Sequence, residues 1–517
     1  MEPFSPRLAL LAVLGWFFYK YLRTTKPTRL PLPPGPKGYP IIGSLFDFPT
    51  TKPWLVYDKW FKTYGDIVYL KVLGRSFLLL GTLERVNDIF ERRSKNYSDR
   101  PRMPMLLENI GLGFLFVLLP YGSSWRRQRR AFHNFFHPNV VDTYYPIQVN
   151  AARRFLRNIL VSSPERHVEL MHTALAETIM EVSYGIKIKG LDDPYVKDAE
   201  SVLEGLADGG TPGRYLVDVF PFMKHIPAWF PGAGWKRKAN AWQDVNRYVA
   251  RKPFELVKEQ MKVGTAAPSI AASLIQKLHD QNSPDLDRAT EEEVAMNTCA
   301  IAYIGGSDTT IAAIQTFFLA MCLYPEAQKK GQAELDRVLK GRLPEFDDRP
   351  SLPYIIAMVK ETMRWLTVTP FGQVHMATDD DEYEGYHIPK GTIVIGDAWR
   401  ILHDPEIYKN PDHFVPDRFI KDGKFNEEIR DPSVAAFGFG RRICPGRYFS
   451  DNSLFIMIAS VLAVYDVKPQ IDDNGREVEI KVDVTGELLS HPLPFSFRII
   501  PRSKAAVYLV NSSELLE

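Results

Sequence analysis

The feature that most constrains the fold is a long apolar stretch at residues 294–323, which contains no proline. It follows Thr290 and Glu293, whose spacing is that of a capping box at a helix start. About 30 residues of helix are ~45 Å long, which is enough to cross a whole domain. We therefore expect one central helix around which the rest of the chain is organised.

Helical patterns also dominate elsewhere, as in the amphipathic segment Pro325–Leu339. Shorter β-like segments lie at 67–74, 76–81, 391–399 and 495–502. A chain of 517 residues could hold about three domains, but it has no internal repeat and no second linker. The sequence predicts a mainly α fold with a minor β-sheet region, in one large domain over residues 41–517.

Composition excludes several classes of protein. Hydrophobic residues make up 45% and charged residues 24% of the chain, which is typical of a globular protein. The net charge of +2 gives no basic excess for binding nucleic acid. The three cysteines, Cys299, Cys322 and Cys444, are too few for a disulfide framework or a four-cysteine zinc site. A reducing compartment is favoured.

The N-terminus predicts a membrane anchor at residues 4–22. Nineteen residues of helix span about 28 Å, close to the thickness of a bilayer core. No small-residue cleavage site follows, although a removed signal or a buried helix remains an alternative. Several basic residues follow this stretch, whereas only Arg7 precedes it, and the more basic side of a span usually lies in the cytosol. We therefore expect a single-pass protein of the endoplasmic reticulum with its catalytic body in the cytosol. Prolines stiffen residues 23–40 into a linker.

The segment at 437–446 reads Phe-Gly-Phe-Gly-Arg-Arg-Ile-Cys-Pro-Gly. Its glycines allow the backbone to approach a flat ligand closely. Arg442 could pair with an acid group. A thiolate at Cys444, near arginines and a helix start, would be stabilised and ready to bind iron. The alternative is an inert cysteine in a tight turn.

This segment resembles the Phe-x-x-Gly-x-Arg-x-Cys-x-Gly signature of the cytochrome P-450 superfamily. The fixed positions are Phe437, Gly440, Arg442, Cys444 and Gly446. The resemblance implies haem b (iron protoporphyrin IX) with the Cys444 thiolate as axial ligand. Phe437, Arg442 and Gly446 would then contact the cofactor.

Residues 304–310 read Ile-Gly-Gly-Ser-Asp-Thr-Thr and resemble the superfamily's Ala/Gly-Gly-x-Asp/Glu-Thr-Thr motif. Two adjacent glycines inside a helix cost roughly 1 kcal/mol each relative to alanine. We expect a local widening of the helix that makes room for dioxygen. Thr309 would hydrogen-bond the oxygen, and Asp308 would relay protons toward it. A plain helix kink is the alternative.

Two further elements match the superfamily. Glu361 and Arg364, with Arg418 in Pro-Asp-Arg-Phe, resemble its Glu-x-x-Arg and Pro-x-Arg-Phe elements and should form a structural charge trio. Trp125 and Arg129, at i and i+4 on one helix face, resemble the Trp-x-x-x-Arg element that holds a haem propionate.

The resemblance also assigns other propionate contacts. Arg442 and His375 occupy positions like the remaining propionate contacts, although Val374 stands where proline is usual. Asp397 and Arg400 replace the common Asn and Ala and put the packing of one turn in doubt. The other arginines of this basic run would face an acidic reductase, with an RNA- or lipid-binding run as the alternative; they are Arg126, Arg127 and Arg130.

The resemblance implies a membrane-bound monooxygenase that oxidises an apolar small molecule with dioxygen and electrons from an NADPH-dependent cytochrome P-450 reductase. A secondary metabolite, such as a terpenoid or aromatic intermediate, is expected because residues 227–232 resemble fungal microsomal members. The alternatives are a haem-thiolate isomerase or dehydratase, and a haem-binding sensor or electron carrier.

Four separated segments resemble the variable substrate-contacting regions of the superfamily and should surround the substrate: residues 103–119, about 203–229, 367–372 and 485–491. The first contains a crowded apolar run without charge, which is costly in water unless it faces a core, a ligand or a bilayer. Phe116 and Phe371 are the candidate pocket residues, with core packing as the alternative.

Overall fold

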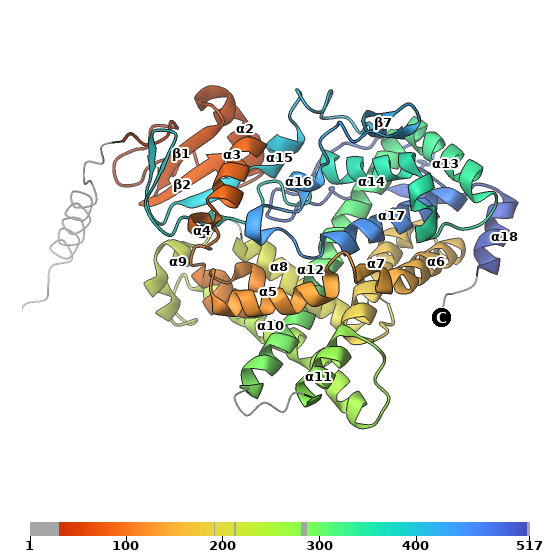
Figure 1. Cartoon of the computed structure of the whole chain (residues 1–517), viewed down its shortest axis with the longest axis horizontal. Coiled ribbons are helices and arrows are strands. Elements are labelled where there is room, and N and C mark those ends of the chain that lie inside the picture. Colours follow the sequence, from red (N-terminus) through yellow and green to blue (C-terminus); the bar gives the residue numbers. More distant parts are fainter. Residues whose placement is uncertain (1–29, 191, 211–213, 281–286, 514–517) are drawn as a thin grey trace, which may run out of the picture.

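A computed structural model describes residues 30–190, 192–210, 214–280 and 287–513. The predicted anchor at residues 4–22 lies outside the described residues. Within them the fold is mainly helical with small sheets, as the sequence predicts (Figure 1).

The longer described helices are α2 (Pro53–Tyr64), α5 (Ser123–Phe136), α6 (Tyr145–Val161), α7 (His167–Tyr184), α8 (Pro194–Gly210), α10 (Gly234–Lys262), α11 (Ile270–Asp280), α12 (Arg288–Leu323), α13 (Pro325–Leu339), α14 (Pro353–Trp365), α17 (Arg447–Val464) and α18 (Lys504–Ser512). The short ones are α3 (Leu83–Asn87), α4 (Ser94–Tyr97), α9 (Leu216–Val219), α15 (Ala398–Leu402) and α16 (Ser433–Ala436). The described strands are β1 (Ile67–Val72), β2 (Arg75–Leu80), β3 (His375–Met376), β4 (Asp381–Tyr383), β5 (Tyr386–Ile388), β6 (Ile393–Gly396), β7 (Ile420–Lys421), β8 (Lys424–Phe425), β9 (Tyr465–Pro469) and β10 (Phe497–Pro501).

The largest sheet has the strand order β1-β2-β6-β3 and lies at one end of the molecule (Figure 1). Leu73 and Gly74 join β1 to β2 with φ of 48° and 80°, the positive values that a two-residue hairpin turn needs. β6 then runs parallel to β2, with Leu78 opposite Val394. The four β-like segments of the sequence are thus confirmed, the last as β10 in a separate sheet with β9.

The described part of the predicted linker belongs to the folded body. The Pro31 carbonyl accepts the His387 N–H at 2.8 Å, and the Pro34 carbonyl accepts the Tyr69 N–H at 2.8 Å. A Cβ on Gly35 would lie 1.9 Å from the Tyr69 oxygen. Residues 30–40 of the predicted linker are therefore held to the β region by their backbone.

α12 is the long central helix that the sequence predicts, but it starts earlier. Asp287 is its N-cap, and the Asp287 carboxylate accepts the Thr290 N–H at 3.3 Å. The predicted capping box of Thr290 and Glu293 is therefore wrong. The helix has 36 residues, or ~54 Å, and it ends before Pro325, which cannot continue it.

α12 is also the one helix among the described residues that is long and apolar enough to span a membrane. However, 72% of its apolar window is buried inside the protein, so it serves as a core helix. It contacts α5, α7, α11 and α17, which lie on different sides of it.

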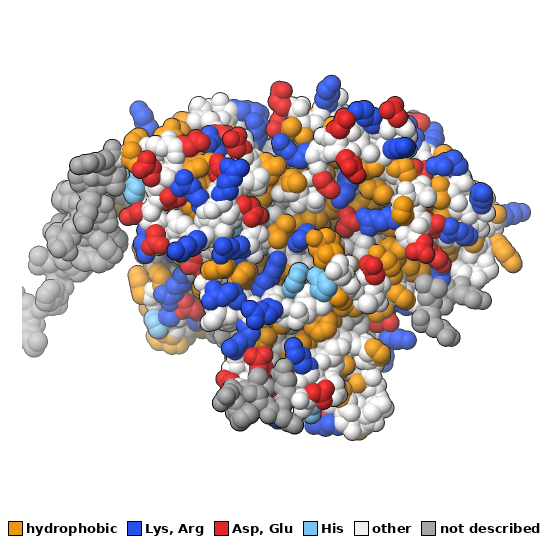
Figure 2. Space-filling model, viewed as in Figure 1, with side chains coloured by type: hydrophobic (Ala, Val, Ile, Leu, Met, Phe, Trp, Pro, Cys, Tyr) orange, Lys and Arg blue, Asp and Glu red, His pale blue; other side chains and the backbone are white. Residues whose placement is uncertain are grey.

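Basic side chains gather over α5 on one face of the molecule (Figure 2). They include Arg126, Arg127 and Arg130, which are all exposed. Trp125 and Arg129 of the same helix point inward, as their spacing predicts.

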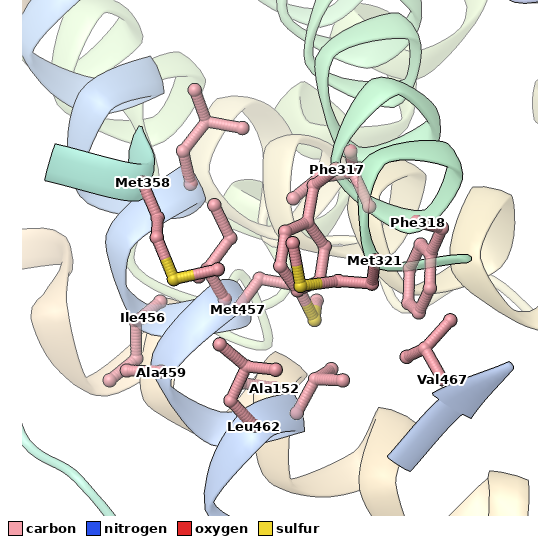
Figure 3. Packing of buried hydrophobic residues seen from close by; sticks show 14 of the residues in the cluster. Ala152, Phe317, Phe318, Met321, Met358, Ile456, Met457, Ala459, Leu462 and Val467 are labelled. Carbon is pink, nitrogen blue, oxygen red and sulfur yellow. The ribbon is translucent and has the colours of Figure 1, made fainter. Parts of the chain in front are cut away.

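The largest core cluster joins α12 to α14 and α17 (Figure 3). Phe317 and Met321 of α12 pack near Met358 of α14 and Met457 of α17, and all four are nearly inaccessible to water. Burying such side chains contributes about 1.5–3 kcal/mol each. This packing fixes α17, whose first residue follows the Cys444 loop.

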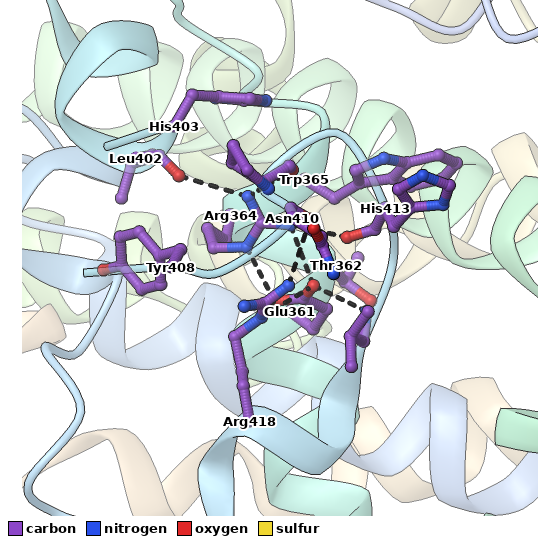
Figure 4. A network of polar contacts seen from close by, with 12 residues as sticks. Glu361, Thr362, Arg364, Trp365, Leu402, His403, Tyr408, Asn410, His413 and Arg418 are labelled. Atoms are coloured by element: carbon purple, nitrogen blue, oxygen red, sulfur yellow. Dashed lines mark hydrogen bonds and ion pairs between the residues drawn. The ribbon is translucent and has the colours of Figure 1, made fainter. Parts of the chain in front are cut away.

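The predicted charge trio is confirmed as a buried network (Figure 4). The Glu361 carboxylate accepts Arg364 Nε at 2.7 Å and Nη2 at 2.8 Å, and Arg418 Nε at 3.2 Å. Glu361 and Arg364 are fully buried. The Val415 N–H also donates to Glu361, at 2.7 Å. The trio thereby holds the Pro416–Phe419 turn against α14.

Asp397 and Arg400, the two departures noted in the sequence, support each other locally. Asp397 caps α15 by accepting the Arg400 N–H at 2.9 Å. The Arg400 guanidinium reaches Asp58 of α2 at 2.6 Å. The turn is thus well packed, although burial raises the pKa of Asp397 to about 8.

Candidate active site

Cys444 closes the loop between α16 and α17. Gly438 and Gly440 have φ of 75° and 58°, which favour glycine. A Cβ on Gly440 would lie 2.3 Å from the Phe90 oxygen. The Cys444 N–H donates to the Phe437 carbonyl at 2.8 Å, so the loop is fixed by its own backbone.

Opposing effects act on the Cys444 thiol. Burial raises its pKa, whereas the Gly446 N–H and the charges of Arg129 and Arg447 lower it, and the net direction is upward. The arginines and the helix start thus favour the thiolate, as the sequence predicts, but burial opposes them more strongly. A metal cation at the sulfur would compensate, because metal binding displaces the thiol proton.

Three buried or half-buried arginines surround the same cavity. They are Arg100, Arg129 and Arg442. In the part of the chain that the structure describes, no ion pair joins any of them to a carboxylate. Arg442 donates to the Ser98 and Leu119 carbonyls at 2.8 and 2.9 Å and stacks on Trp125.

Burial lowers the pKa of Arg129 and of Arg442 to about 10 in each case. Two buried donors near them, Arg442 Nη1 and Trp125 Nε1, have no partner among the described residues. Buried cations and donors without partners are costly unless a ligand satisfies them. They fit the two propionates of haem b.

His375 also lies in this cavity, as the sequence predicts. Its Nδ1 bonds the Tyr97 carbonyl at 2.7 Å, so Nδ1 carries the proton. Burial and the nearby Arg100 charge lower the pKa of His375 well below its usual range. The neutral ring therefore presents Nε2 as an acceptor and has no second N–H to donate to a propionate.

α12 forms the opposite wall without the predicted widening. It is a regular α-helix across Gly305 and Gly306, so that prediction is wrong. A Cβ on Gly306 would lie 2.9 Å from Ile179 of α7, whereas Gly305 leaves open space. The Thr309 hydroxyl lines the cavity and donates to the Gly305 carbonyl at 2.8 Å.

Asp308 faces away from this cavity. Successive residues of a helix point about 100° apart, so Asp308 and Thr309 diverge. The Asp308 carboxylate lies 3.0 Å from His491 Nε2 in a second, smaller cavity. The structure therefore does not bring Asp308 to the Cys444 cavity.

The rest of the cavity is apolar, and all four predicted segments contribute to it. Their lining residues are Leu115, Phe116, Val117 and Leu118, then Leu203 and Leu206, then Val368, Thr369 and Gly372, and finally Leu488 and Leu489. No acidic residue lines it among those described.

Phe371 is not among these lining residues. Its ring packs against Trp54 of α2 at 6.4 Å between centroids, in a cluster beneath the sheet. The proposal of Phe371 as a pocket residue is thus corrected, because the loop turns at Gly372 (φ 60°) and directs the ring the other way.

Arg100 is a site residue that the sequence did not reveal. It is held by the carbonyls of Val117, Gln373 and Val374, at 3.0, 3.0 and 2.5 Å. Backbone carbonyls from distant segments leave no side-chain pattern.

Comparison with known proteins decides the family. The family model described as Cytochrome P-450 matches residues 33–499. The chain belongs to the cytochrome P-450 family. Members are haem-thiolate monooxygenases, in which a cysteine thiolate binds the haem iron. They take dioxygen, a substrate and electrons from a redox partner.

Fungal relatives match along nearly the whole chain. The cytochrome P-450 monooxygenase COX2 of Coprinopsis cinerea is 46% identical over 93% of this chain and 91% of its own length. Cytochrome P-450 monooxygenase 98 of Postia placenta is 42% identical, covering 98% and 97%. Tryptamine 4-monooxygenase of Psilocybe cyanescens is 37% identical, covering 98% and 99%.

Proposed function

We propose that Cys444 is the axial thiolate ligand of haem b and that the enzyme hydroxylates or otherwise oxidises an apolar small molecule of secondary metabolism. The observation that carries this proposal is that Cys444, three arginines without carboxylate partners among the described residues, and the Gly305 and Thr309 face of α12 share one cavity.

The haem would supply activation of dioxygen. Arg129, Arg442 and Trp125 would bind its propionates, which fixes its orientation. The apolar lining would exclude bulk water and orient the substrate by shape. The Thr309 hydroxyl would serve as a hydrogen-bond donor at the cavity wall. Gly305 has no side chain and so leaves open space beside this hydroxyl.

Replacing Thr309 with Ala tests the monooxygenase step. We expect normal haem content but less product per NADPH, with more peroxide or water, because the hydroxyl no longer positions a proton. The measurement is product, NADPH and peroxide with reductase present. Thr316→Ala, on the same helix and in the core, is the matched control. An unchanged ratio of product to NADPH consumed would show that Thr309 takes no part in the mechanism.

The alternatives predict different results. A haem-thiolate isomerase or dehydratase needs no external electrons, and the resemblance implies that such enzymes lose the acid–alcohol pair that Asp308 and Thr309 retain. A sensor or electron carrier needs no apolar cavity. Product formation that depends on NADPH and reductase would exclude both.

The substrate should be neutral and largely apolar, such as a terpenoid or aromatic intermediate. A charged group in the distal part of the cavity would lack a partner, which is costly. Phe116→Ala should change product regiochemistry or affinity several-fold while leaving haem content unchanged, because Phe116 lines the cavity. Phe371→Ala is the control. Larger spectral shifts from charged amines or acids would contradict this pocket.

The basic face over α5 is the proposed docking site for the NADPH-dependent reductase. Arg126 stacks on Tyr121, and Arg441 of the Cys444 loop donates to the Tyr121 hydroxyl at 2.9 Å. The basic face is therefore continuous with the loop that carries Cys444. Electrostatic attraction of this kind raises association rates and weakens with salt.

Membrane attachment through residues 4–22, on the endoplasmic reticulum with a cytosolic body, remains part of the proposal. It is supported by an apolar end patch, made of exposed Tyr39, Ile41, Phe46, Phe222, Trp229 and Phe230. Arg75 donates to the Asp218 carbonyl, which joins both halves of the patch at one end. Deletion of residues 1–29 should leave weak binding to lipid vesicles, and Trp229→Ser in the deleted protein should abolish it. If the protein without residues 1–29 did not bind vesicles at all, the apolar end patch would not be a membrane-contacting surface.

A further inference from the structure

The Cys444 cavity has few polar side chains away from its arginines and from the Cys444 loop. Gln373 lies at the arginine end, since its carbonyl accepts a hydrogen bond from Arg100. Ser450 lies beside the Cys444 loop, because its N–H donates to the Gly446 carbonyl. The other side-chain hydroxyls that line the cavity belong to Thr309, Thr310 and Thr369. A ligand in this apolar part of the cavity would therefore meet few hydrogen-bonding groups.

Thr369 differs from the other two threonines in the freedom of its hydroxyl. The Thr309 hydroxyl already donates to the Gly305 carbonyl at 2.8 Å. Thr310 is only 4% exposed within α12. Thr369 is half-buried, and its hydroxyl makes no hydrogen bond in the part of the chain that the structure describes. Of the three hydroxyls, that of Thr369 is therefore the most available to a ligand.

The backbone around Thr369 is fixed by other segments of the chain. The Thr369 carbonyl accepts the Gly372 N–H at 3.0 Å, which closes a turn. The preceding carbonyl, that of Val368, accepts the Ser490 N–H of the C-terminal loop at 2.8 Å. Pro370 restricts the backbone of the residue before it, and a β-branched side chain has few rotamers. The Thr369 hydroxyl therefore has a defined position at the cavity wall.

An unpaired hydroxyl in apolar surroundings affects which ligands bind. Val368 and the nearby Leu488 and Leu489 line the same cavity. A substrate that fills this space displaces the water that would otherwise bind the Thr369 hydroxyl, and a buried hydroxyl without a hydrogen bond is costly. An oxygen on the substrate would restore the bond. A threonine hydroxyl both donates and accepts, so it fits a hydroxyl or a carbonyl oxygen.

We propose that Thr369 is a specificity-determining residue that hydrogen-bonds a hydroxyl or carbonyl oxygen of the substrate. The inference rests on the proposed monooxygenase function and narrows its substrate class to apolar molecules that already carry an oxygen. An earlier oxygen-introducing reaction must then supply the substrate. The bond would also hold the substrate in one orientation and so limit which of its carbons can be oxidised.

The direct test measures binding without turnover. Equilibrium dialysis of the full-length, haem-loaded enzyme would use matched neutral pairs: adamantane with adamantanol, and cyclododecane with cyclododecanone. For each pair the dissociation constant of the oxygenated member is divided by that of the hydrocarbon. Thr369→Val should raise this ratio by about fivefold, the typical contribution of one hydrogen bond. A ratio that does not change, or oxygenated members that do not bind the wild type, would overturn the proposal.

Two further variants separate the hydroxyl from the segment that carries it. Thr369→Ser keeps the hydroxyl and should keep the wild-type ratio. Thr367→Val removes a hydroxyl that already donates to the Arg364 carbonyl at 3.2 Å and does not line the cavity, so it should also leave the ratio unchanged. If Thr369→Val does not bind haem, Thr369→Ala is compared with Thr369→Ser instead. An equal rise of the ratio in Thr367→Val would show that the hydroxyl of Thr369 has no specific role.

This proposal and the proposed function fail in different ways. If the wild type forms oxygenated product with NADPH and reductase while the ratio is the same in Thr369→Val, the substrate anchor is wrong and the monooxygenase stands. If the wild type forms no oxygenated product from any substrate, the proposed function fails. The dialysis ratio then still decides whether the Thr369 hydroxyl binds an oxygen of the ligand, because dialysis requires no turnover.

Discussion

Replacing Glu361 with Gln should lower the free energy of unfolding by about 3–5 kcal/mol, because the change leaves buried cations without their counter-charge. Arg364 is fully buried and the Arg418 side chain is 7% exposed, so water cannot replace the carboxylate. Glutamine has nearly the same shape, so the effect reports the charge and not a cavity.

Glu428→Gln is the matched control. Its ion pair with Lys421 is largely exposed, and such pairs contribute at most about 1 kcal/mol. Urea unfolding of both variants, followed by tryptophan fluorescence, provides the measurement. If Glu361→Gln changed stability no more than Glu428→Gln, the trio would not be structural.

Replacing Arg129 with Met should speed haem loss by about 10- to 100-fold, the equivalent of one charge-assisted hydrogen bond. Among the described residues no side-chain hydrogen bond or ion pair neutralises the Arg129 guanidinium, so its charge is available to a haem propionate. The same change should not destabilise the haem-free protein, because burial already lowers the pKa of this guanidinium to about 10.

The neighbouring Arg130→Met is the control, since Arg130 is exposed on the same helix. Haem transfer to an excess of a scavenging haem protein gives the rate of loss, and thermal unfolding without haem gives stability. Equal haem loss from the two variants would show that Arg129 does not hold the cofactor.

Local chemistry made much of the site predictable from the sequence. The Cys444 loop needs glycine at Gly440 because the Phe90 backbone is so close, and this requirement leaves a visible motif. Trp125 and Arg129 are four residues apart, so helix geometry alone predicts that they lie on the same face of α5. The Glu361 trio was predicted from its resemblance to the family's elements, because a charge pair at i and i+3 is by itself usually exposed.

Features set by distant segments could not be predicted. Helix geometry directs Asp308 to a different face of α12 from Thr309. The sequence does not show that a second cavity, lined by His491, lies on that face. Phe371 has the composition of a pocket residue, yet the turn at Gly372 directs it toward Trp54. Arg100 is bound by carbonyls, which carry no side-chain signal.

The central claim is that Cys444 binds haem iron as a thiolate. The most direct measurement is the absorption spectrum of the reduced protein with carbon monoxide, for wild type and for Cys444→Ser. We expect the wild-type band near the wavelength that names the family, and its loss in the variant. A wild-type spectrum typical of histidine-ligated haem, or a Cys444→Ser variant that keeps the wild-type band, would contradict the assignment.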